Sequence, residues 1–402
     1  MPAELTPPEF HKRYPSLGTG AVSTDMYWKP EIFAKEVEAI FRPSWHYLGR
    51  IEQIQRPGDF FVRELRTFGI SVLVVRGEDN EIRAFFNACM HRGNKLQVRT
   101  VGRRRTFTCK FHGWRYALDG KVDHIPDKEG FPGIDCKNIK LKQLNTAIWE
   151  GFIFVNINDQ PEQTLEEYLG SQGGDLVGYP FEKGVTQFKI ETEVNCNWKF
   201  LLDSFTESYH IGQLHNRSIN GPMAGPDNPF GRAVDVRIKG LHRSFGTRGN
   251  LNFKPKPVQQ LALNYSPGLS LTAAGGEADH KPKGVNPTDS PDWCMDVNVF
   301  FPNLLCTIGG GTYFTHQVWP LSANKTHWEL TGYLRPATNA AHRFGQEHAL
   351  VELRDVVLED LNILERIQKN IETGLIPEFH FHDHEIALRY QNYTVEHKIS
   401  GT

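Results

Sequence analysis

The 402-residue sequence has no long hydrophobic run and no strong excess of one charge. No segment approaches the ~20 consecutive apolar residues that cross a bilayer, so no membrane span is predicted. The net charge of -2 gives no reason to expect nucleic acid or an anionic membrane as a partner. The first residues contain no basic segment followed by an apolar one, so we expect no secretory signal and a cytoplasmic protein.

Cysteine is also scarce, because the chain has only six. Six are too few for a disulfide scaffold in a chain of this length, and in cytosolic proteins Cys and His in pairs more often bind metal or take part in catalysis. There is no internal repeat and no Gly-rich dinucleotide fingerprint; the sequence GGDLVG is no substitute for one. We therefore do not expect the chain to take electrons from NAD(P)H directly.

The chain divides into a part with β-rich residue patterns and a later part with mixed ones. Apolar spacing predicts an amphipathic helix at 30–42, and short β-rich runs separated by turn residues over 45–157 predict a small antiparallel sandwich or barrel. A linker helix is expected at 161–170. Beyond residue 185, strand-like segments, among them 186–194, 304–308 and 326–334, alternate with helical ones. They end in a long helix at 347–371, which suggests an α+β domain folded around a cavity.

The sharpest local signal is a pair of short Cys–His arms. Cys89 and His91 form the first arm, and Cys109 and His112 form the second after a gap of seventeen residues. Such ligands suit either a tetrahedral zinc ion or a [2Fe–2S] cluster with two Cys on one iron and two His on the other. Zinc sites usually pair Cys with Cys and His with His. The mixed pairing within each arm therefore favours the cluster.

The residues around both arms resemble the Rieske family. Its pattern C-x-H-R-G is present at 89–93, and its pattern C-x2-H-G-W-x-Y at 109–116. Respiratory-type Rieske proteins carry an additional Cys in each loop; here those positions hold Asn94 and Phe111, which points to the oxygenase branch. The resemblance implies that the two Cys of the arms bind one iron and the two His bind the other.

A second group of polar residues lies in an apolar, helix-like segment. Asp203, Glu207 and His210 are spaced i, i+4 and i+7, so on a regular helix they would share one face. His215 follows His210 by five residues, which puts their side chains about 140° out of phase. Both can reach one metal only if the helix is distorted or ends between them, which Gly212 would permit. A buried helix with satisfied polar groups is the alternative, but two His beside two carboxylates favour a metal site.

Two His and one carboxylate form the facial triad of non-haem Fe(II) oxygenases. The long helix near the end of the chain offers Glu359 and Asp360 as the third ligand. Relative to the apolar stripe of that helix, Asp360 lies about 60° from the centre and Glu359 about 160°. We therefore expect Asp360 to face the interior and Glu359 to be solvated.

This region resembles the ring-hydroxylating oxygenases, whose pattern is N-W-K, an acidic residue, two residues, His, four residues, His and a late Asp. The resemblance implies that His210, His215 and Asp360 are iron ligands. It also implies that Glu207 is the acidic residue that bridges the two metal centres, where many relatives carry Asp and others Glu. Asp203 occupies a near-iron position that is often Asn, and its role stays open.

The resemblance covers most of the chain. It implies an α+β protein with an antiparallel β Rieske [2Fe–2S] domain at 43–160 and a helix-grip (Bet v 1-like) catalytic domain at 161–402, on which the segment 1–42 packs. The resemblance is weakest over 217–340, which should line the substrate pocket. The aromatic and apolar residues of this part suit an apolar or aromatic substrate; they are Phe245, Leu251, Phe253, Phe300, Phe301 and Phe314.

The predicted function is the oxygenase component of a multicomponent system that hydroxylates an aromatic or apolar cyclic substrate, as in aromatic hydrocarbon catabolism. It would use O2 and electrons that a separate reductase takes from NAD(P)H and delivers directly or through a ferredoxin. An alternative is a monooxygenase that removes O- or N-methyl groups or oxidises a quaternary ammonium, which Glu207 mildly favours. The resemblance also implies a homo-oligomer, commonly a trimer, and leaves a small β subunit open. The remaining alternative is an electron-transfer or structural metal protein. It is disfavoured because such a protein would not use His210, His215 and Asp360.

Two further patterns have plainer interpretations. His380, His382 and His384 alternate, and on a strand they would share one face. Similar tails in relatives hold no metal, so packing or surface exposure is favoured over a metal site. The three Arg at 103–105 form a solvated loop tip or, alternatively, a docking patch for an acidic electron donor.

Overall fold

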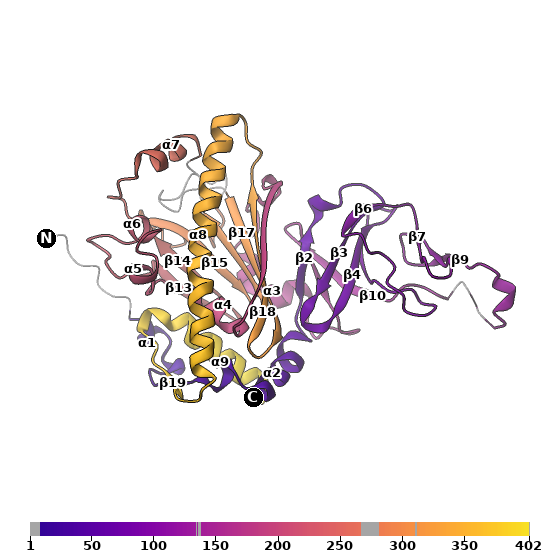
Figure 1. Cartoon of the computed structure of the whole chain (residues 1–402), viewed down its shortest axis with the longest axis horizontal. Helices are drawn as coiled ribbons and strands as arrows, with labels where there is room; N and C mark the ends of the chain where they lie inside the picture. The colour runs from indigo at the N-terminus through magenta and orange to yellow at the C-terminus, as the bar shows by residue number, and fades with distance from the viewer. Residues whose placement is uncertain (1–8, 134, 136–137, 267–280, 310–311, 402) are drawn as a thin grey trace. The chain divides into compact units, whose positions relative to one another are not determined.

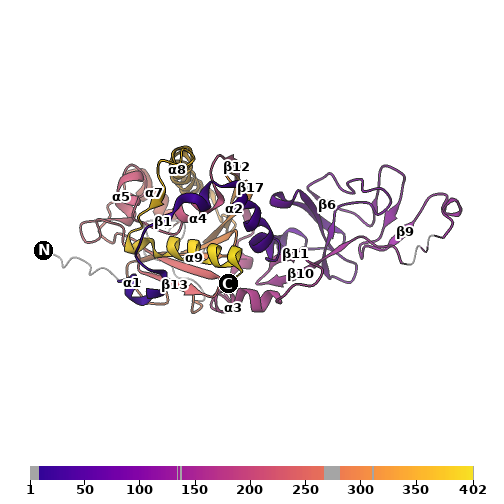
Figure 2. The ribbon, with the colours of Figure 1, turned by 90° about the horizontal axis from the view of Figure 1, so that it is seen from below.

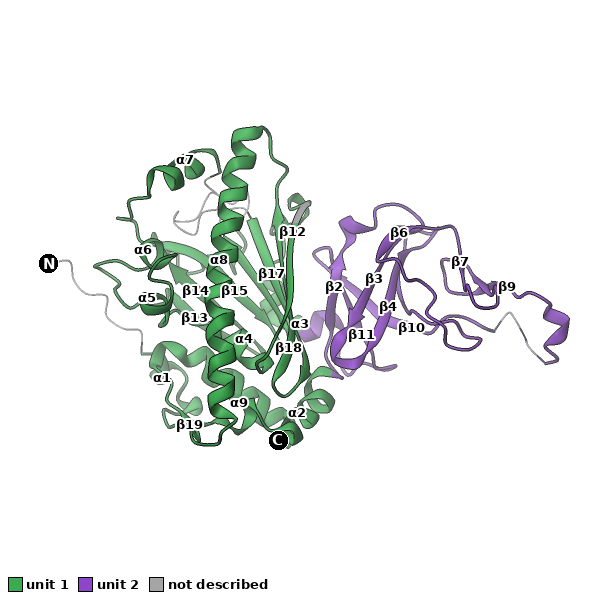
Figure 3. Cartoon of the chain, viewed as in Figure 1, with its two compact units in different colours: residues 1–41, 169–402 green, residues 42–168 purple. Residues whose placement is uncertain are grey.

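The structure is a computed structural model that describes residues 9–133, 135, 138–266, 281–309 and 312–401. The chain divides into two compact units: a larger unit of residues 1–41 and 169–402, and a smaller unit of residues 42–168 (Figure 3). No helix in the described ranges is long and apolar enough to cross a membrane.

The smaller unit is built almost entirely from antiparallel strands. Seven of them form one sheet in the order β2-β11-β10-β5-β4-β3-β6, and three form a second sheet in the order β7-β8-β9 (Figure 1). Their bounds are β2 His46–Arg50, β3 Asp59–Leu65, β4 Ile70–Arg76, β5 Ile82–Phe86, β6 Val101–Arg103, β7 Phe107–Thr108, β8 Arg115–Tyr116, β9 Val122–His124, β10 Gln143–Trp149 and β11 Phe152–Asn156. Side chains from both sheets share one apolar core that includes Phe60, Phe85, Phe107 and Trp114. The predicted β-rich texture is confirmed.

The larger unit is a seven-stranded antiparallel sheet with helices on its faces. The strand order is β12-β18-β17-β16-β15-β14-β13. The bounds are β12 Thr186–Val194, β13 Asp235–Lys239, β14 His242–Arg248, β15 Trp293–Phe300, β16 Leu304–Gly309, β17 Thr312–Ser322 and β18 Lys325–Leu334. The long helix α8 (Ala340–Ile371) lies across one face, and α9 (Ile386–Ser400) runs along the lower end of the unit (Figures 1 and 2).

The beginning of the chain belongs to the larger unit because it pairs with the end. β1 (Val22–Ser23) forms an antiparallel ladder with β19 (Glu378–Phe379). The predicted helix at 30–42 is present as α2 (Pro30–Glu36), followed by one wider turn at Val37–Phe41. Glu36 from α2 is fully buried and accepts a hydrogen bond from Lys199 at 2.5 Å. This ion pair ties the N-terminal segment to the helix that leads into the metal-site segment.

Alternation along β15 separates two chemically different faces of the sheet. Met295 and Val297 point to the side of α8, where they line a cavity. Asp296 and Asn298 point to the opposite side, where Asn298 accepts a hydrogen bond from Gln172 at 2.7 Å. Gln172 belongs to α3 (Leu165–Gly174), the predicted linker helix, which kinks at Gly170.

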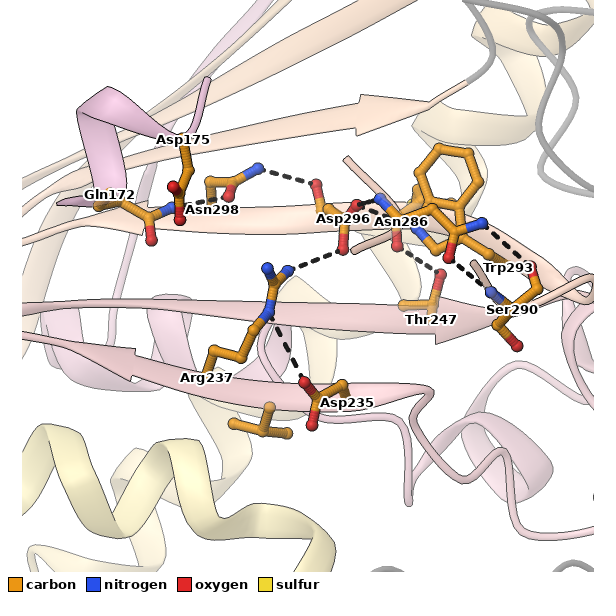
Figure 4. Close-up of polar contacts among 12 residues, drawn as sticks. Gln172, Asp175, Asp235, Arg237, Thr247, Asn286, Ser290, Trp293, Asp296 and Asn298 are labelled. Carbon is orange, nitrogen blue, oxygen red and sulfur yellow. Dashed lines mark hydrogen bonds and ion pairs between the residues drawn. The ribbon is translucent and has the colours of Figure 1, made fainter. Parts of the chain in front are cut away.

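The opposite face carries a buried polar network (Figure 4). Asp296 is its centre: Oδ2 accepts hydrogen bonds from the backbone N–H of Asn286 at 2.7 Å and from Nε1 of Trp293 at 3.0 Å, and Oδ1 lies 3.4 Å from Arg237. Burial raises the pKa of Asp296 to about 6, although these donors act to lower it. The network attaches the connection before β15 to the sheet.

Candidate metal centres

The two Cys–His arms form a matched pair of loops in the smaller unit. In the first, the backbone N–H of Gly93 donates to Cys89, and in the second that of Gly113 donates to Cys109, at 2.9 and 3.0 Å. Both glycines have positive φ, +73° and +76°, which a side chain would strain. The sequence pattern C-x-H-R-G therefore reflects a turn that returns the chain immediately after its two ligands.

The loops bring like ligands together. The thiols of Cys89 and Cys109 interact with each other, and the rings of His91 and His112 lie with centroids 4.6 Å apart. The hydroxyl of Tyr116 lies 3.2 Å from Sγ of Cys89. This pairing matches a cluster that has two Cys on one iron and two His on the other.

The environment of the loops fits metal binding. Nδ1 of His91 is buried and has no hydrogen-bond partner among the described residues, a costly arrangement unless a metal binds there. Stacking on Trp114 at 5.0 Å fixes the orientation of its ring. Burial acts to raise the pKa of the Cys109 thiol, but the N–H of Phe111 and the amide of Asn94 outweigh it, so this pKa is lowered and the thiolate is favoured.

The second predicted site lies in the larger unit, but not on one regular helix. α4 (Trp198–Ser204) ends before Glu207, and a short α5 (Ile211–Leu214) follows. The expectation that Asp203, Glu207 and His210 share a helix face is therefore wrong. The break falls at 205–210 rather than at Gly212, so that His210 and His215 flank α5 at its two ends.

The chain break brings the three predicted ligands together. Nε2 of His210 lies 3.1 Å from Nε2 of His215, and Oδ1 of Asp360 lies 3.5 and 3.3 Å from these two atoms. Oδ1 of Asp360 is buried and accepts no hydrogen bond within the described chain. Three lone pairs that converge without a proton donor among them fit a 2-His-1-carboxylate metal site.

Each His of this triad has a carboxylate at its other ring nitrogen. Glu207 contacts Nδ1 of His210, and Glu359 lies 2.7 Å from Nδ1 of His215. A carboxylate there holds the proton on Nδ1 and leaves Nε2 free to bind metal. The expectation that Glu359 is solvated is corrected: it is only partly exposed and also accepts a hydrogen bond from Ser218 at 2.7 Å.

Asp203 lies close to the triad, but within the described chain its carboxylate forms no hydrogen bond or ion pair with the three ligand side chains. Its carboxylate accepts hydrogen bonds from the hydroxyl of Tyr27 at 2.8 Å and from Gln391 at 2.7 Å. Burial raises the pKa of Asp203 to about 7. It shares a mainly apolar cavity with Glu207 and Glu385. Burial also raises the pKa of Glu385 to about 7.

A second cavity also borders the triad, shares His210 and Asp360 with the first, and is the candidate substrate pocket. It is lined by His210, His215 and Asp360 together with mostly apolar residues of the segment 205–223, of the sheet and of α8, namely Phe205, Ile211, Ile219, Met223, Phe245, Met295, Val297, Phe314, Leu353, Val356 and Val357. Of the six pocket residues expected from the sequence, Phe245 and Phe314 are at this cavity. Phe300 and Phe301 are buried in the core, and Leu251 is exposed.

The remaining sequence hypotheses have structural answers. His382 stacks on Tyr209, with parallel rings 4.7 Å apart, and His384 is buried against Phe10, so packing accounts for both. His380 is exposed. Arg103 belongs to β6 and forms an ion pair with Asp59 at 2.6 Å.

A Cys2His2 cluster-type loop pair in an antiparallel β unit, and a 2-His-1-carboxylate site in an α+β unit, define a two-centre iron protein. The ring-hydroxylating α-subunit family (catalytic domain) matches residues 182–401, and the Rieske [2Fe–2S] domain matches residues 44–143. The chain belongs to the ring-hydroxylating α-subunit family. Its cofactors are accordingly a Rieske [2Fe–2S] cluster and a mononuclear iron.

Known relatives fall into two substrate groups. The chain is 29% identical over 192 residues to the carnitine monooxygenase oxygenase subunit of Acinetobacter pittii, covering 47% of this chain and 51% of the relative. It is 31% identical over 221 residues to the biphenyl 2,3-dioxygenase subunit alpha of Rhodococcus jostii, covering 52% and 46%. The matched region thus spans about half the length of these relatives.

A solved structure shares the fold over nearly the whole chain. The quaternary ammonium Rieske monooxygenase CntA, in complex with an inhibitor, superimposes with a TM-score of 0.73 at 18% identity. The match covers 98% of this chain and 99% of that one. The predicted fold class is confirmed.

Proposed function

We propose that this chain is the oxygenase component of a Rieske system that uses O2 to oxidise a methyl-bearing substrate, in particular a quaternary ammonium compound. The convergence of His210, His215 and Asp360 beside a mainly apolar cavity carries the oxygenase assignment. The relatives named for carnitine favour the monooxygenase alternative over the aromatic substrate first expected. Phenylalanine rings at 205, 245 and 314 suit a quaternary ammonium group, which binds to aromatic faces.

Hydroxylation of an aromatic compound is the second candidate. It is supported by the apolar lining, in which the described residues include no Lys or Arg, and by the relative named for biphenyl. This candidate would place the chain in aromatic hydrocarbon catabolism.

We assign the metal ligands as follows: the two Cys and two His of the arms hold the cluster, and His210, His215 and Asp360 hold the mononuclear iron. When bound, the iron would supply O2 activation and the cluster would supply electrons one at a time. Glu207 and Glu359 orient the two His rings and keep the protons on Nδ1. Glu207 is also the residue proposed to connect the two centres.

We further propose a cytoplasmic homotrimer in which residues 43–160 are the Rieske domain and 1–42 with 161–402 the catalytic part. The thiols at 89 and 109 support a reducing compartment, because they must stay reduced to bind iron. A separate reductase, with or without a ferredoxin, would deliver electrons from NAD(P)H, since the sequence has no dinucleotide fingerprint.

Product analysis under 18O2 tests the proposal. The iron-loaded protein, a surrogate reductase and a panel of quaternary ammonium, O-methyl and aromatic compounds would be incubated, and the products examined by mass spectrometry. One 18O atom in the product, with formaldehyde or an aldehyde released, supports the monooxygenase. Two 18O atoms in a cis-diol would establish the aromatic candidate instead. An absence of oxidised product from every class, with both iron centres spectroscopically intact, would count against the oxygenase assignment.

A further inference from the structure

A histidine outside the triad lines the candidate substrate pocket. His316 lies on β17 and packs against Phe205, with ring centroids 4.2 Å apart. The side chain is almost completely buried, with 1% of its surface exposed. From the neighbouring strand β18, Nε1 of Trp328 donates a hydrogen bond to Nδ1 of His316 at 3.1 Å. One nitrogen of the ring is therefore engaged by the protein.

That hydrogen bond determines where the proton of the ring lies. An indole N–H can only donate, so Nδ1 of His316 must accept and carries no proton. Burial lowers the pKa of His316 to about 3, and the ring is neutral at ordinary pH. A neutral imidazole has one N–H, which in His316 must be at Nε2. No residue that the structure describes forms a hydrogen bond with Nε2, so this N–H is left for a ligand.

No other polar group that lines the cavity in the described chain is restricted to donating. The hydroxyl of Ser204 donates to the carbonyl of Leu201 at 3.3 Å. His210, His215 and Asp360 are assigned to metal, and the hydroxyl of Thr247 donates to the carbonyl of Met295 at 3.3 Å. Thr307 on β16 also lines the cavity, but its hydroxyl can donate or accept and so selects neither. The described lining residues include no Lys or Arg that would neutralise a carboxylate.

We propose that His316 determines specificity by donating a hydrogen bond from Nε2 to an uncharged oxygen acceptor of the substrate, namely a hydroxyl, ether or carbonyl oxygen. The inference rests on the proposed function and narrows its substrate class. A plain hydrocarbon would leave the buried N–H unpaired, which is costly in a cavity from which water is displaced. A substrate carboxylate would be buried without a cationic partner.

Binding of matched probe pairs tests the inference without turnover. Iron-loaded protein without reductase would be titrated by calorimetry with choline and with propyltrimethylammonium, and with methoxybenzene and ethylbenzene. The members of each pair differ in an oxygen atom at nearly constant size. We expect the oxygen-bearing member to bind about 3- to 10-fold more tightly, the range for one neutral hydrogen bond.

Three variants locate the source of that preference. In His316→Phe, the ratio within each pair should fall to about one, while the affinity for the oxygen-free member changes little. In Trp328→Phe, Nδ1 loses its donor and the ring can adopt either tautomer, so the ratio should fall part of the way. Thr307→Val is the matched control on the adjacent strand and should leave the ratio unchanged. Iron content and the absorption spectrum confirm that each variant is folded.

Several results would overturn the inference. In the wild type, these are equal binding of the two members of each pair, no binding of any probe, or tighter binding of glycine betaine, a carboxylate, than of choline. In the variants, they are a preference that survives in His316→Phe or one that disappears in Thr307→Val. None of these touches the proposed function, which depends on product formation under 18O2. If ethylbenzene is oxidised and His316→Phe leaves every binding ratio unchanged, the oxygenase assignment holds and the specificity role of His316 is wrong.

Discussion

Each histidine of the triad is oriented by a carboxylate from a different part of the chain. Glu207 lies three residues before His210, whereas Glu359 reaches His215 from α8, where it precedes the proposed ligand Asp360. A single pair of adjacent acidic residues on α8 thus supplies one proposed ligand and one orienting group. Both His rings thus have a carboxylate at Nδ1. The two carboxylates differ in exposure, since Glu207 is more buried than Glu359.

Glu359→Gln should weaken iron binding at the mononuclear site. The amide can still accept from Nδ1 of His215, but it no longer stabilises that ring through charge, so we expect about a 10- to 100-fold loss of iron affinity. Competition with a chelator, with the cluster absorption as internal reference, measures this. Glu347→Gln is the control, since Glu347 is exposed on the same helix and pairs with Arg343. Equal iron affinity in both variants would contradict the assigned role.

Glu207→Gln should leave both metal centres bound yet stop turnover. Gln keeps the length of the side chain and an acceptor for Nδ1 of His210, while removing the charge proposed to connect the centres. Because Glu207 also orients His210, iron affinity should fall about as in Glu359→Gln, so the variant is assayed after reconstitution to full iron content. Product formation should still fall by about 100-fold or more. Full product formation in a variant with three irons per chain would show that the connecting role is wrong.

At the scale of single residues, common motifs in the sequence predicted which candidate ligand side chains the structure brings together. Helical periodicity correctly turned Asp360 inward, because the apolar stripe of α8 is regular. The same argument misplaced Glu359, because the segment with His215 and Ser218 also contacts α8 there, and both side chains lie 2.7 Å from the Glu359 carboxylate. His316 gave no signal, since a lone His on a strand is ordinary until its contact with Trp328 is known.

At the scale of elements, α8 depends on a close approach at Gly345. A Cβ atom there would lie 2.8 Å from the carbonyl oxygen of Ala262 on α7 (Pro257–Tyr265) and 2.6 Å from Cβ of Ser266. Gly345→Ala should therefore push α7 away and lower the free energy of unfolding by about 1–3 kcal/mol, as overpacking does. Urea denaturation measures it. Gly174→Ala is the control, because its Cβ would meet no atom within 4 Å, and it should be neutral or slightly stabilising.

Strand β15 should make stability depend on pH through Asp296. Burial raises the pKa of Asp296 from 3.8 to about 6, so the folded state holds its proton more tightly than the unfolded state. Its contribution to stability is therefore complete below pH 3.8 and is lost as the pH rises to about 6, at about 1.4 kcal/mol per pH unit.

Urea denaturation of the wild type and of Asp296→Asn between pH 4.5 and 7 measures this contribution. The difference in the free energy of unfolding, wild type minus variant, should fall with rising pH and level off above pH 6. A difference that is constant or that rises over this range would mean that the donors around Asp296 outweigh its burial.

Strands rich in β-branched and aromatic residues were predicted well, and polar or Gly- and Pro-rich stretches were not. The predicted strands at 186–194, 304–308 and 326–334 are present nearly residue for residue. Composition was the signal there rather than alternation, because both faces of β16 and β18 are largely buried. β13 and β14 were missed in a stretch dominated by Gly and Pro signals, since their charged side chains pair with other buried groups. α9 was missed because most of its residues are polar although many are buried. The break at 205–210 was placed wrongly because tertiary packing, not Gly212, ends α4.

At the scale of the whole molecule, the proposed trimer predicts that electrons pass between subunits. A His91→Ala chain lacks a complete cluster, and an Asp360→Ala chain lacks a complete mononuclear site, so each alone should be inactive. Coexpressed chains that form mixed oligomers should regain a substantial fraction of wild-type product formation if the cluster of one chain serves the iron of another. Mixed oligomers that stay inactive, with both partial metal contents intact, would confine the electron path to one chain.

The contact between His215 and Glu359 joins positions 144 residues apart. A metal ion shared by His215 and Asp360, the residue after Glu359, would therefore act, in polymer terms, as a cross-link across just over half of the larger unit. Closing a loop of that size with a disulfide removes chain entropy worth about 5 kcal/mol from the unfolded state. The iron would be a reversible cross-link. Its loss would remove both the catalytic activity and the attachment of α8 to the segment that carries His215.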